Sequence, residues 1–236
     1  MGLPKIDQPL FEVTVPSTGK KAKFRPFTVK EEKILLIAQE SKDIDQIILA
    51  VKQIIGNCVF GPDVEYMPLF DLEYLLMNIR AKSVNNEVTF NVQDPDTEED
   101  IELTIDINEI EMKHDPDHSK KVELNDEYYM MMRYPTINEI DSLVVKEGES
   151  EAEGTFRTMI SCIETLVNVK SDEVYKFEDF TNEEITDFVD QFTANTIEGI
   201  QNFFITVPKM TYECPYKDNT GKDKVFKMEG METFFM

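Results

Sequence analysis

The chain has 236 residues, enough for one large domain or two small ones. Its net charge of −23 arises from 47 acidic and 24 basic side chains. Because phosphate groups and anionic lipids repel such a protein, we expect neither a nucleic acid nor a membrane among its partners.

The first elements are predicted to be a β-hairpin followed by a helix. Residues 11–15 and 21–24 alternate between apolar and polar side chains, and a Pro-Ser-Thr-Gly turn separates them. Thr28 and Glu31 have the spacing of a capping box, which opens a helix whose apolar side chains follow in residues 34–38.

Two further helices and a second hairpin are predicted next. Apolar residues recur every three or four positions over residues 43–59, and again after Pro68 as far as Ile79. Residues 87–92 and 101–107 then alternate as paired strands around a turn at residues 94–97.

The second half of the chain predicts a similar order of elements. A polar linker at residues 113–120 precedes a hairpin at residues 122–132. Thr136 and Glu139 repeat the capping-box spacing. Helices are predicted over residues 156–167, 185–192 and 196–204, and strands over residues 210–214 and 225–228.

This repetition predicts an internal duplication. The segment Phe-Arg-Pro-Phe-Thr at residues 24–28 corresponds to Met-Arg-Tyr-Pro-Thr at residues 132–136, and Cys58 and Cys162 fall at matching places late in each second helix. We expect an α+β fold of two similar lobes, each with β-hairpins flanking a small helical bundle. The expected domains are residues 1–112 and 121–236, joined by the linker at residues 113–120.

Charged residues are unevenly distributed. Six basic residues lie between Lys20 and Lys33, among them Lys20, Lys21, Lys23 and Arg25, whereas residues 94–117 contain eleven acids and one lysine. These patches could steer another protein, or a second copy, into a head-to-tail contact. The alternative, two solvated faces without a partner, is the usual reason for such runs and is favoured.

No catalytic, cofactor or metal site is expected. Pro116 lies between His114 and His118 and argues against a helix that would place both on one side. The acids at residues 94–102 lack the glycine and the final bidentate acid of a calcium loop. Few, widely separated cysteines and no apolar N-terminal segment predict a reducing cytoplasm and no signal peptide.

Two pairs of adjacent phenylalanines are candidate contact residues. The pairs are Phe203 with Phe204 and Phe234 with Phe235. Adjacent side chains point to different sides of a helix or strand, so one ring of each pair could anchor a partner protein. Burial of both rings between the lobes is an equally good interpretation.

Several stretches resemble the T4-like bacteriophage baseplate hub proteins. They are residues 14–41, with their Phe-Arg-Pro-Phe step, residues 68–84, and the closing residues 203–204, 208–210 and 229–235. The resemblance implies a late structural protein of a contractile tail with no catalytic residues to transfer. Some relatives carry Cys-x-x-Cys pairs in the hairpins, and this chain lacks them, so the resemblance implies no metal here.

We therefore expect a non-enzymatic hub component that acts through contacts with other tail and hub proteins. The alternative is an assembly factor or chaperone for the hub or tape measure protein that leaves the particle. A homo-oligomer is also compatible with the sequence. The expected location is the bacterial cytoplasm during assembly and the tail baseplate afterwards. Two rivals are a metal-dependent hydrolase using the acids at residues 94–102, and an acidic mimic of DNA.

Overall fold

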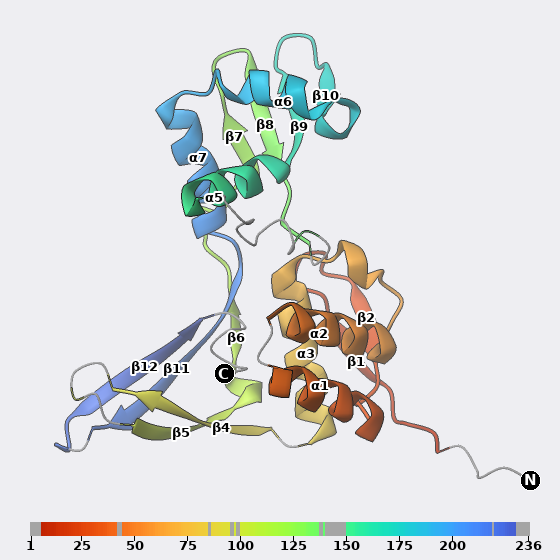
Figure 1. Ribbon diagram of the computed structural model, residues 1–236, viewed down its shortest axis with the longest axis vertical. Coiled ribbons are helices and arrows are strands. Elements are labelled where there is room, and N and C mark those ends of the chain that lie inside the picture. Colours follow the sequence, from red (N-terminus) through yellow and green to blue (C-terminus); the bar gives the residue numbers. More distant parts are fainter. Residues whose placement is uncertain are drawn as a thin grey trace, which may run out of the picture. The chain divides into compact units, whose positions relative to one another are not determined.

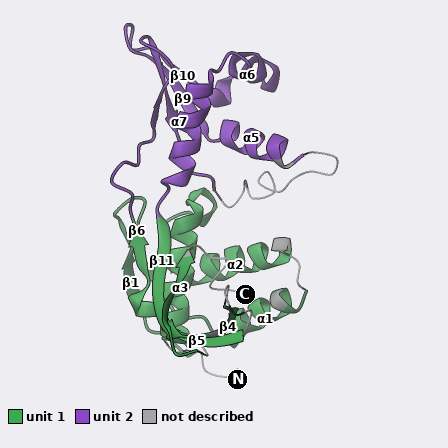
Figure 2. Cartoon of the chain, turned by 90° about the vertical axis from the view of Figure 1, so that its left-hand side faces the viewer, with its two compact units in different colours: residues 1–113, 209–236 green, residues 114–208 purple. Residues whose placement is uncertain are grey.

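The chain divides into two compact units. The computed structural model describes residues 6–41, 44–84, 86–94, 97, 100–136, 139, 150–218 and 220–229. Unit 1 comprises residues 1–113 together with 209–236, and unit 2 comprises residues 114–208 (Figure 2). The predicted division differs at the end of the chain, because residues 209–236 return to unit 1 instead of completing the second lobe.

Unit 1 begins with a small antiparallel sheet in the order β1-β2-β3. The strands are β1 (Phe11–Thr14), β2 (Lys21–Phe24) and β3 (Val59–Phe60), of which Figure 1 labels the first two. Val13, Ala22 and Phe24 are buried while their strand neighbours Thr14, Lys21 and Lys23 are exposed, so the alternation in the sequence follows the two faces of the sheet. Gly19 closes the turn with a φ of 65°, a conformation that side chains with a Cβ rarely adopt.

Three helices accompany this sheet: α1 (Val29–Ser41), α2 (Ile44–Cys58) and α3 (Leu69–Ser83). A single 3-10 turn (Val64–Tyr66) precedes α3, which starts directly after Pro68 as predicted. Asp71 in the first turn of α3 is buried and accepts hydrogen bonds from the backbone N–H (2.9 Å) and the hydroxyl of Ser17. The turn between β1 and β2 is thereby fixed to α3, and burial raises the pKa of Asp71.

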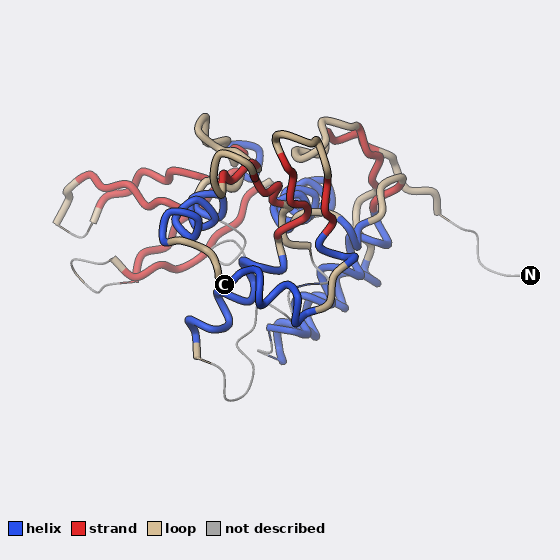
Figure 3. Tube along the Cα trace, turned by 90° about the horizontal axis from the view of Figure 1, so that it is seen from above, coloured by secondary structure: helices blue, strands red, loops and turns tan. Residues whose placement is uncertain are grey.

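Two long hairpins complete unit 1 and lie side by side in Figures 1 and 3. One consists of β4 (Glu87–Gln93) and β5 (Asp100–Asp106), and the other of β11 (Lys209–Lys217) and β12 (Asp223–Glu229). After a 3-10 turn (Ile107–Glu109), the short strand β6 (Glu111–Lys113) pairs with β11, giving a second sheet in the order β12-β11-β6.

Apolar packing explains why the end of the chain returns to unit 1. The buried residues of one cluster come from α3, from β5 and its following turn, and from the last hairpin: Met77, Leu103, Ile105, Ile107, Met210, Cys214 and Met228. Without the last hairpin, this apolar face of the first would be open to water. Both hairpins were predicted, but their mutual packing was not.

Unit 2 is built on a four-stranded sheet in the order β10-β9-β8-β7. Its strands are β7 (Lys121–Glu123), β8 (Tyr128–Met132), β9 (Ile163–Asn168) and β10 (Val174–Lys176). The helices are α5 (Glu151–Ser161), α6 (Asn182–Val189) and α7 (Ala194–Ile205), with a 3-10 turn (Phe177–Asp179) before α6. A Cβ on Gly199 of α7 would lie 2.9 Å from a methyl group of Val122, so the missing side chain lets α7 approach β7 closely.

The predicted α+β class is confirmed, but one predicted helix is wrong in its second half. The helix expected over residues 156–167 ends at Ser161, and Ile163–Asn168 forms β9 between β8 and β10. Apolar residues three and four apart fit a helix, yet a short apolar segment also fits a central strand. Pairing with both neighbouring strands decides the outcome. The residues predicted as a linker divide differently, since Lys113 ends β6 and residues 114–120 belong to unit 2.

Candidate protein interface

An arginine–glutamate pair stabilises the junction between sheet and helix in unit 1. Arg25 donates to both carboxylate oxygens of Glu31, at 3.0 and 3.4 Å. The same carboxylate accepts from the N–H of Thr28 at 2.9 Å and from its hydroxyl at 2.7 Å. The backbone N–H of Arg25 donates to the carbonyl oxygen of Cys58 at the end of α2, at 2.9 Å.

The same four residue types recur in unit 2. Arg133 donates to both oxygens of Glu139, one at 2.7 Å, and Glu139 accepts from the N–H of Thr136 at 2.9 Å. The backbone N–H of Arg133 donates to the carbonyl oxygen of Cys162 at 2.8 Å. We call each set of arginine, threonine, glutamate and cysteine a junction node. The repeated node supports the predicted duplication.

Each node alters the acidity of its members. Burial alone would raise the pKa of Glu31, but hydrogen bonds from Arg25 and Thr28 outweigh this effect and lower the pKa to about 2. The pKa of Glu139 is lowered by the corresponding contacts. Burial raises the pKa of both Cys58 and Cys162 to about 11, so neither thiol is reactive in the folded chain.

An ion-pair cluster links the two hairpins of unit 1. Lys224 lies 2.8 and 2.9 Å from the two carboxylate oxygens of Asp94 and 3.4 Å from Asp218. The hydroxyl of Tyr216 donates to Asp94 at 2.7 Å. Asp94, one of the acids considered for a hydrolase, is 1% exposed and connects two hairpins. In the described part of the chain, no three His, Cys, Asp or Glu side chains are placed to hold a metal ion.

The predicted interface residues have different environments. Phe203 is 2% exposed in the core of unit 2, where it packs on His118 and Tyr134, so it is a core residue rather than a surface anchor. Phe204 is half-buried against Phe203, with ring centroids 5.1 Å apart. Phe234 and Phe235 lie outside the described residues.

The basic candidates in unit 1 are not equivalent either. Lys20, Lys21 and Lys23 are exposed, and Lys21 forms a solvent-exposed pair with Glu12 at 3.4 Å. The side chain of Arg25, in contrast, is largely buried and forms an ion pair with Glu31 in its junction node.

The two histidines, which the sequence places in a polar linker, also have different environments. His114 is exposed, whereas the ring nitrogens of His118 lie 2.8 Å from the hydroxyls of Thr206 and Tyr134. Burial, followed by the nearby charge of Lys120, lowers the pKa of His118. These contacts tie the segment before β7 to the end of α7.

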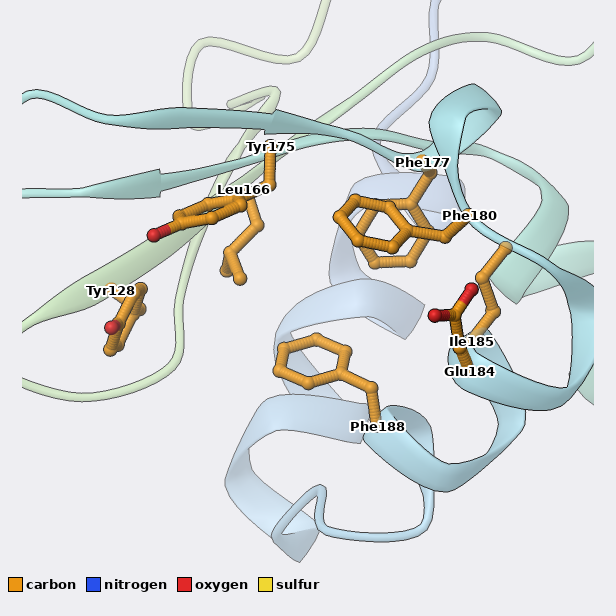
Figure 4. A pocket seen from close by; sticks show the side chains of 8 residues that line it. All are labelled: Tyr128, Leu166, Tyr175, Phe177, Phe180, Glu184, Ile185 and Phe188. Carbon is orange, nitrogen blue, oxygen red and sulfur yellow. The ribbon is translucent and has the colours of Figure 1, made fainter.

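A pocket of about 400 Å³ opens on the surface of unit 2 (Figure 4). It is lined by side chains from β8, β9, β10, the 3-10 turn, α6 and the segment between the last two: Tyr128, Leu166, Tyr175, Phe177, Phe180, Glu184, Ile185 and Phe188. In Figure 4 the ring of Phe188 points from α6 into the space near Leu166 and Phe177. Phe180 is 42% exposed, so an aromatic side chain at this pocket is open to solvent.

Acidic residues accompany the aromatic rings. Residues 173–190 contain seven acids and one lysine, Lys176. Glu184 belongs to the capping box of α6, and hydrogen bonds from Thr181 lower its pKa, so it carries a negative charge in the pocket wall. Glu173 accepts from the hydroxyl of Tyr175 at 2.9 Å. Aromatic faces beside carboxylates favour a ligand that combines apolar surface with positive charge.

Sequence reasoning missed this pocket because its lining comes from five separate elements. The signal that could have indicated it is the run of four phenylalanines between residues 177 and 192, which is more aromatic surface than one short helix can bury.

A family model described as T4 bacteriophage base plate protein matches residues 8–236. The chain belongs to this family. Neither the curated proteins nor the solved structures contain a match to it. As a baseplate protein of a phage tail, it has other baseplate and tail proteins as its partners. Among the described helices, none combines the length and apolar character needed to cross a bilayer.

Proposed function

We propose that this baseplate protein is a component of the hub that is retained in the virion and acts through protein–protein contacts rather than catalysis. The aromatic pocket of unit 2 is the observation that carries the proposal. It combines a concave aromatic lining, a partly exposed ring at Phe180 and a charged wall at Glu184. Aromatic side chains in a pocket are typical of the residues that dominate binding energy at protein interfaces.

The placement of the methionines argues against the alternative of a chaperone. The twelve methionines would suit a surface that adapts to long apolar segments. In the described part of the chain, however, none is exposed: Met67, Met77, Met130, Met132, Met210 and Met228 are buried, and the other three are intermediate. These methionines fill the cores of the two units, so they do not form a holding surface.

Quantitative mass spectrometry of purified virions tests the proposal. We expect the chain in intact particles in a fixed ratio to other baseplate proteins, and its loss would identify a factor that leaves after assembly. A phage carrying Phe180→Ser should incorporate less of the chain, because the substitution removes exposed aromatic surface without opening a core. The matched control Val169→Ser changes an exposed apolar residue elsewhere in unit 2 and should incorporate normally.

A further inference from the structure

The helix α1 has an apolar and basic face that is open to solvent. Val29 is 65%, Leu36 53% and Ile37 65% exposed, although all three are apolar. With 3.6 residues per turn, these residues fall on the same side of the helix as two lysines, Lys30 and Lys33, and one acid, Glu40, all of which are exposed. Glu31, Leu35 and Ala38 are buried on the opposite side. We call this side of α1 the basic stripe.

The basic stripe and the pocket of unit 2 have complementary chemistry. The stripe offers aliphatic side chains beside two ammonium groups, and the pocket offers aromatic rings beside carboxylates. A lysine stem can lie on an aromatic face while its ammonium group meets an acid at the rim. Glu184 lines the pocket itself, and two further exposed acids, Asp179 and Asp187, flank its phenylalanines in the sequence.

We propose that the pocket of unit 2 binds the basic stripe of α1 from a second copy of this chain. The contact is head to tail: each copy presents its stripe to one neighbour and its pocket to another. This inference deepens the proposed function, since it names the partner of the pocket. The net charge of −23 opposes association at long range, but physiological salt screens repulsion beyond about 8 Å, so the local contacts decide the outcome.

Self-association of the purified full-length chain tests the contact. Sedimentation equilibrium at physiological ionic strength should show an average mass that rises above 27.4 kDa with protein concentration. A chain that remains monomeric throughout overturns the proposal, even if a basic peptide or another baseplate protein occupies the pocket. Because this assay needs no virion, its failure is distinct from failure of the hub assignment.

Charge reversal makes the test specific. The variant Lys30→Glu with Lys33→Glu, and the variant Asp179→Lys with Asp187→Lys, should each weaken self-association at least about tenfold, since like charges then face each other. An equimolar mixture of the two variants should associate again, because the acidic stripe of one now meets the basic pocket of the other. A mixture that stays monomeric while the wild type associates overturns the proposal.

Matched controls separate this contact from a general effect of charge. Lys113→Glu with Lys222→Glu changes the net charge of unit 1 equally, and Asp117→Lys with Glu198→Lys does so in unit 2, all at exposed positions outside the stripe and the pocket. These controls should associate as the wild type does. If they lose association as strongly as the test variants, total charge governs the assembly and the proposed contact is wrong.

Discussion

The two junction nodes place the same side chains in different surroundings. In unit 1 the side chain of Glu31 is 2% exposed and that of Arg25 is 20% exposed, whereas the values for Glu139 and Arg133 in unit 2 are 21% and 34%. The hydrogen-bonding pattern is the same, with threonine and arginine both donating to the carboxylate. A repeated local sequence therefore repeats the geometry, while the rest of each unit determines how strongly solvent screens the pair.

The cysteine in each node provides a way to measure how readily its own unit opens. Cys58 and Cys162 are fully buried, with their pKa values raised to about 11. Each thiol becomes reactive only when the structure around it opens. Alkylation at pH 8 followed by peptide mapping therefore reports the opening of unit 1 through Cys58 and that of unit 2 through Cys162.

The largest expected effect is that of Glu31→Gln. This substitution removes the charge that compensates Arg25 at a buried site, so unit 1 should lose about 3 kcal/mol of unfolding free energy at pH 7. Urea unfolding followed by circular dichroism measures the loss, and Cys58 labelling should accelerate more than Cys162 labelling. Glu32→Gln at the exposed neighbouring position is the control and should have little effect.

The effect of Glu31→Gln should depend on pH in a defined direction. The folded-state pKa of Glu31, about 2, lies below its ordinary value of 4.5. The stabilisation is therefore complete above the ordinary value and is lost as the pH falls through the folded-state pKa. The difference between variant and wild type should shrink between pH 5 and pH 2, and a constant difference would contradict the assignment.

The second largest effect is expected for Asp94→Ala, in the hairpins rather than in a junction node. Lys224 would keep its contact with Asp218 but lose its nearer partner, so unit 1 should lose about 2 kcal/mol of unfolding free energy. Labelling of Cys214, which lies on β11, should accelerate most. The control Asp223→Ala breaks the exposed pair with Lys217 and should have little effect, because solvent screens that pair.

A smaller loss of unfolding free energy, about 1 kcal/mol, is expected for Glu139→Gln in unit 2. The contacts are the same as in unit 1, but both side chains are more exposed, so solvent screens more of the interaction. Cys162 labelling should accelerate more than Cys58 labelling. If this variant loses as much stability as Glu31→Gln, the difference in burial does not control the strength of the nodes.

The smallest effect concerns acidification of unit 2. Because the folded-state pKa of His118 is lowered, the unfolded chain binds a proton first, and unit 2 should lose stability as the pH falls below the ordinary value of 6.5. Urea midpoints measured between pH 7.5 and 5.5 test this expectation. His118→Gln should reduce the pH dependence.

Local signals were predicted well from the sequence, and long-range contacts were not. The capping signals at Thr28 and Thr136 depend on residues three positions apart, and the glutamate contacts to the threonine N–H are present at both. In contrast, the contact between Asp94 and Lys224 spans 130 positions, and the pocket draws on five elements. The apolar spacing after Phe156 fits helix and strand equally, so only pairing with β8 and β10 identifies β9.

The pairing of β6 with β11 has a consequence for synthesis of the protein. Lys113 pairs with Lys209 in this antiparallel ladder, so the polypeptide enters and leaves unit 2 through adjacent strands of unit 1. During translation all of unit 2 is synthesised before β11, so the hairpin of β4 and β5 and the strand β6 leave the ribosome without their closing partner. Until β11 and β12 are translated, the nascent chain exposes the apolar side chains of Leu103 and Ile105 and an unpaired strand edge at β6. A stalled or truncated polypeptide would therefore be prone to aggregation.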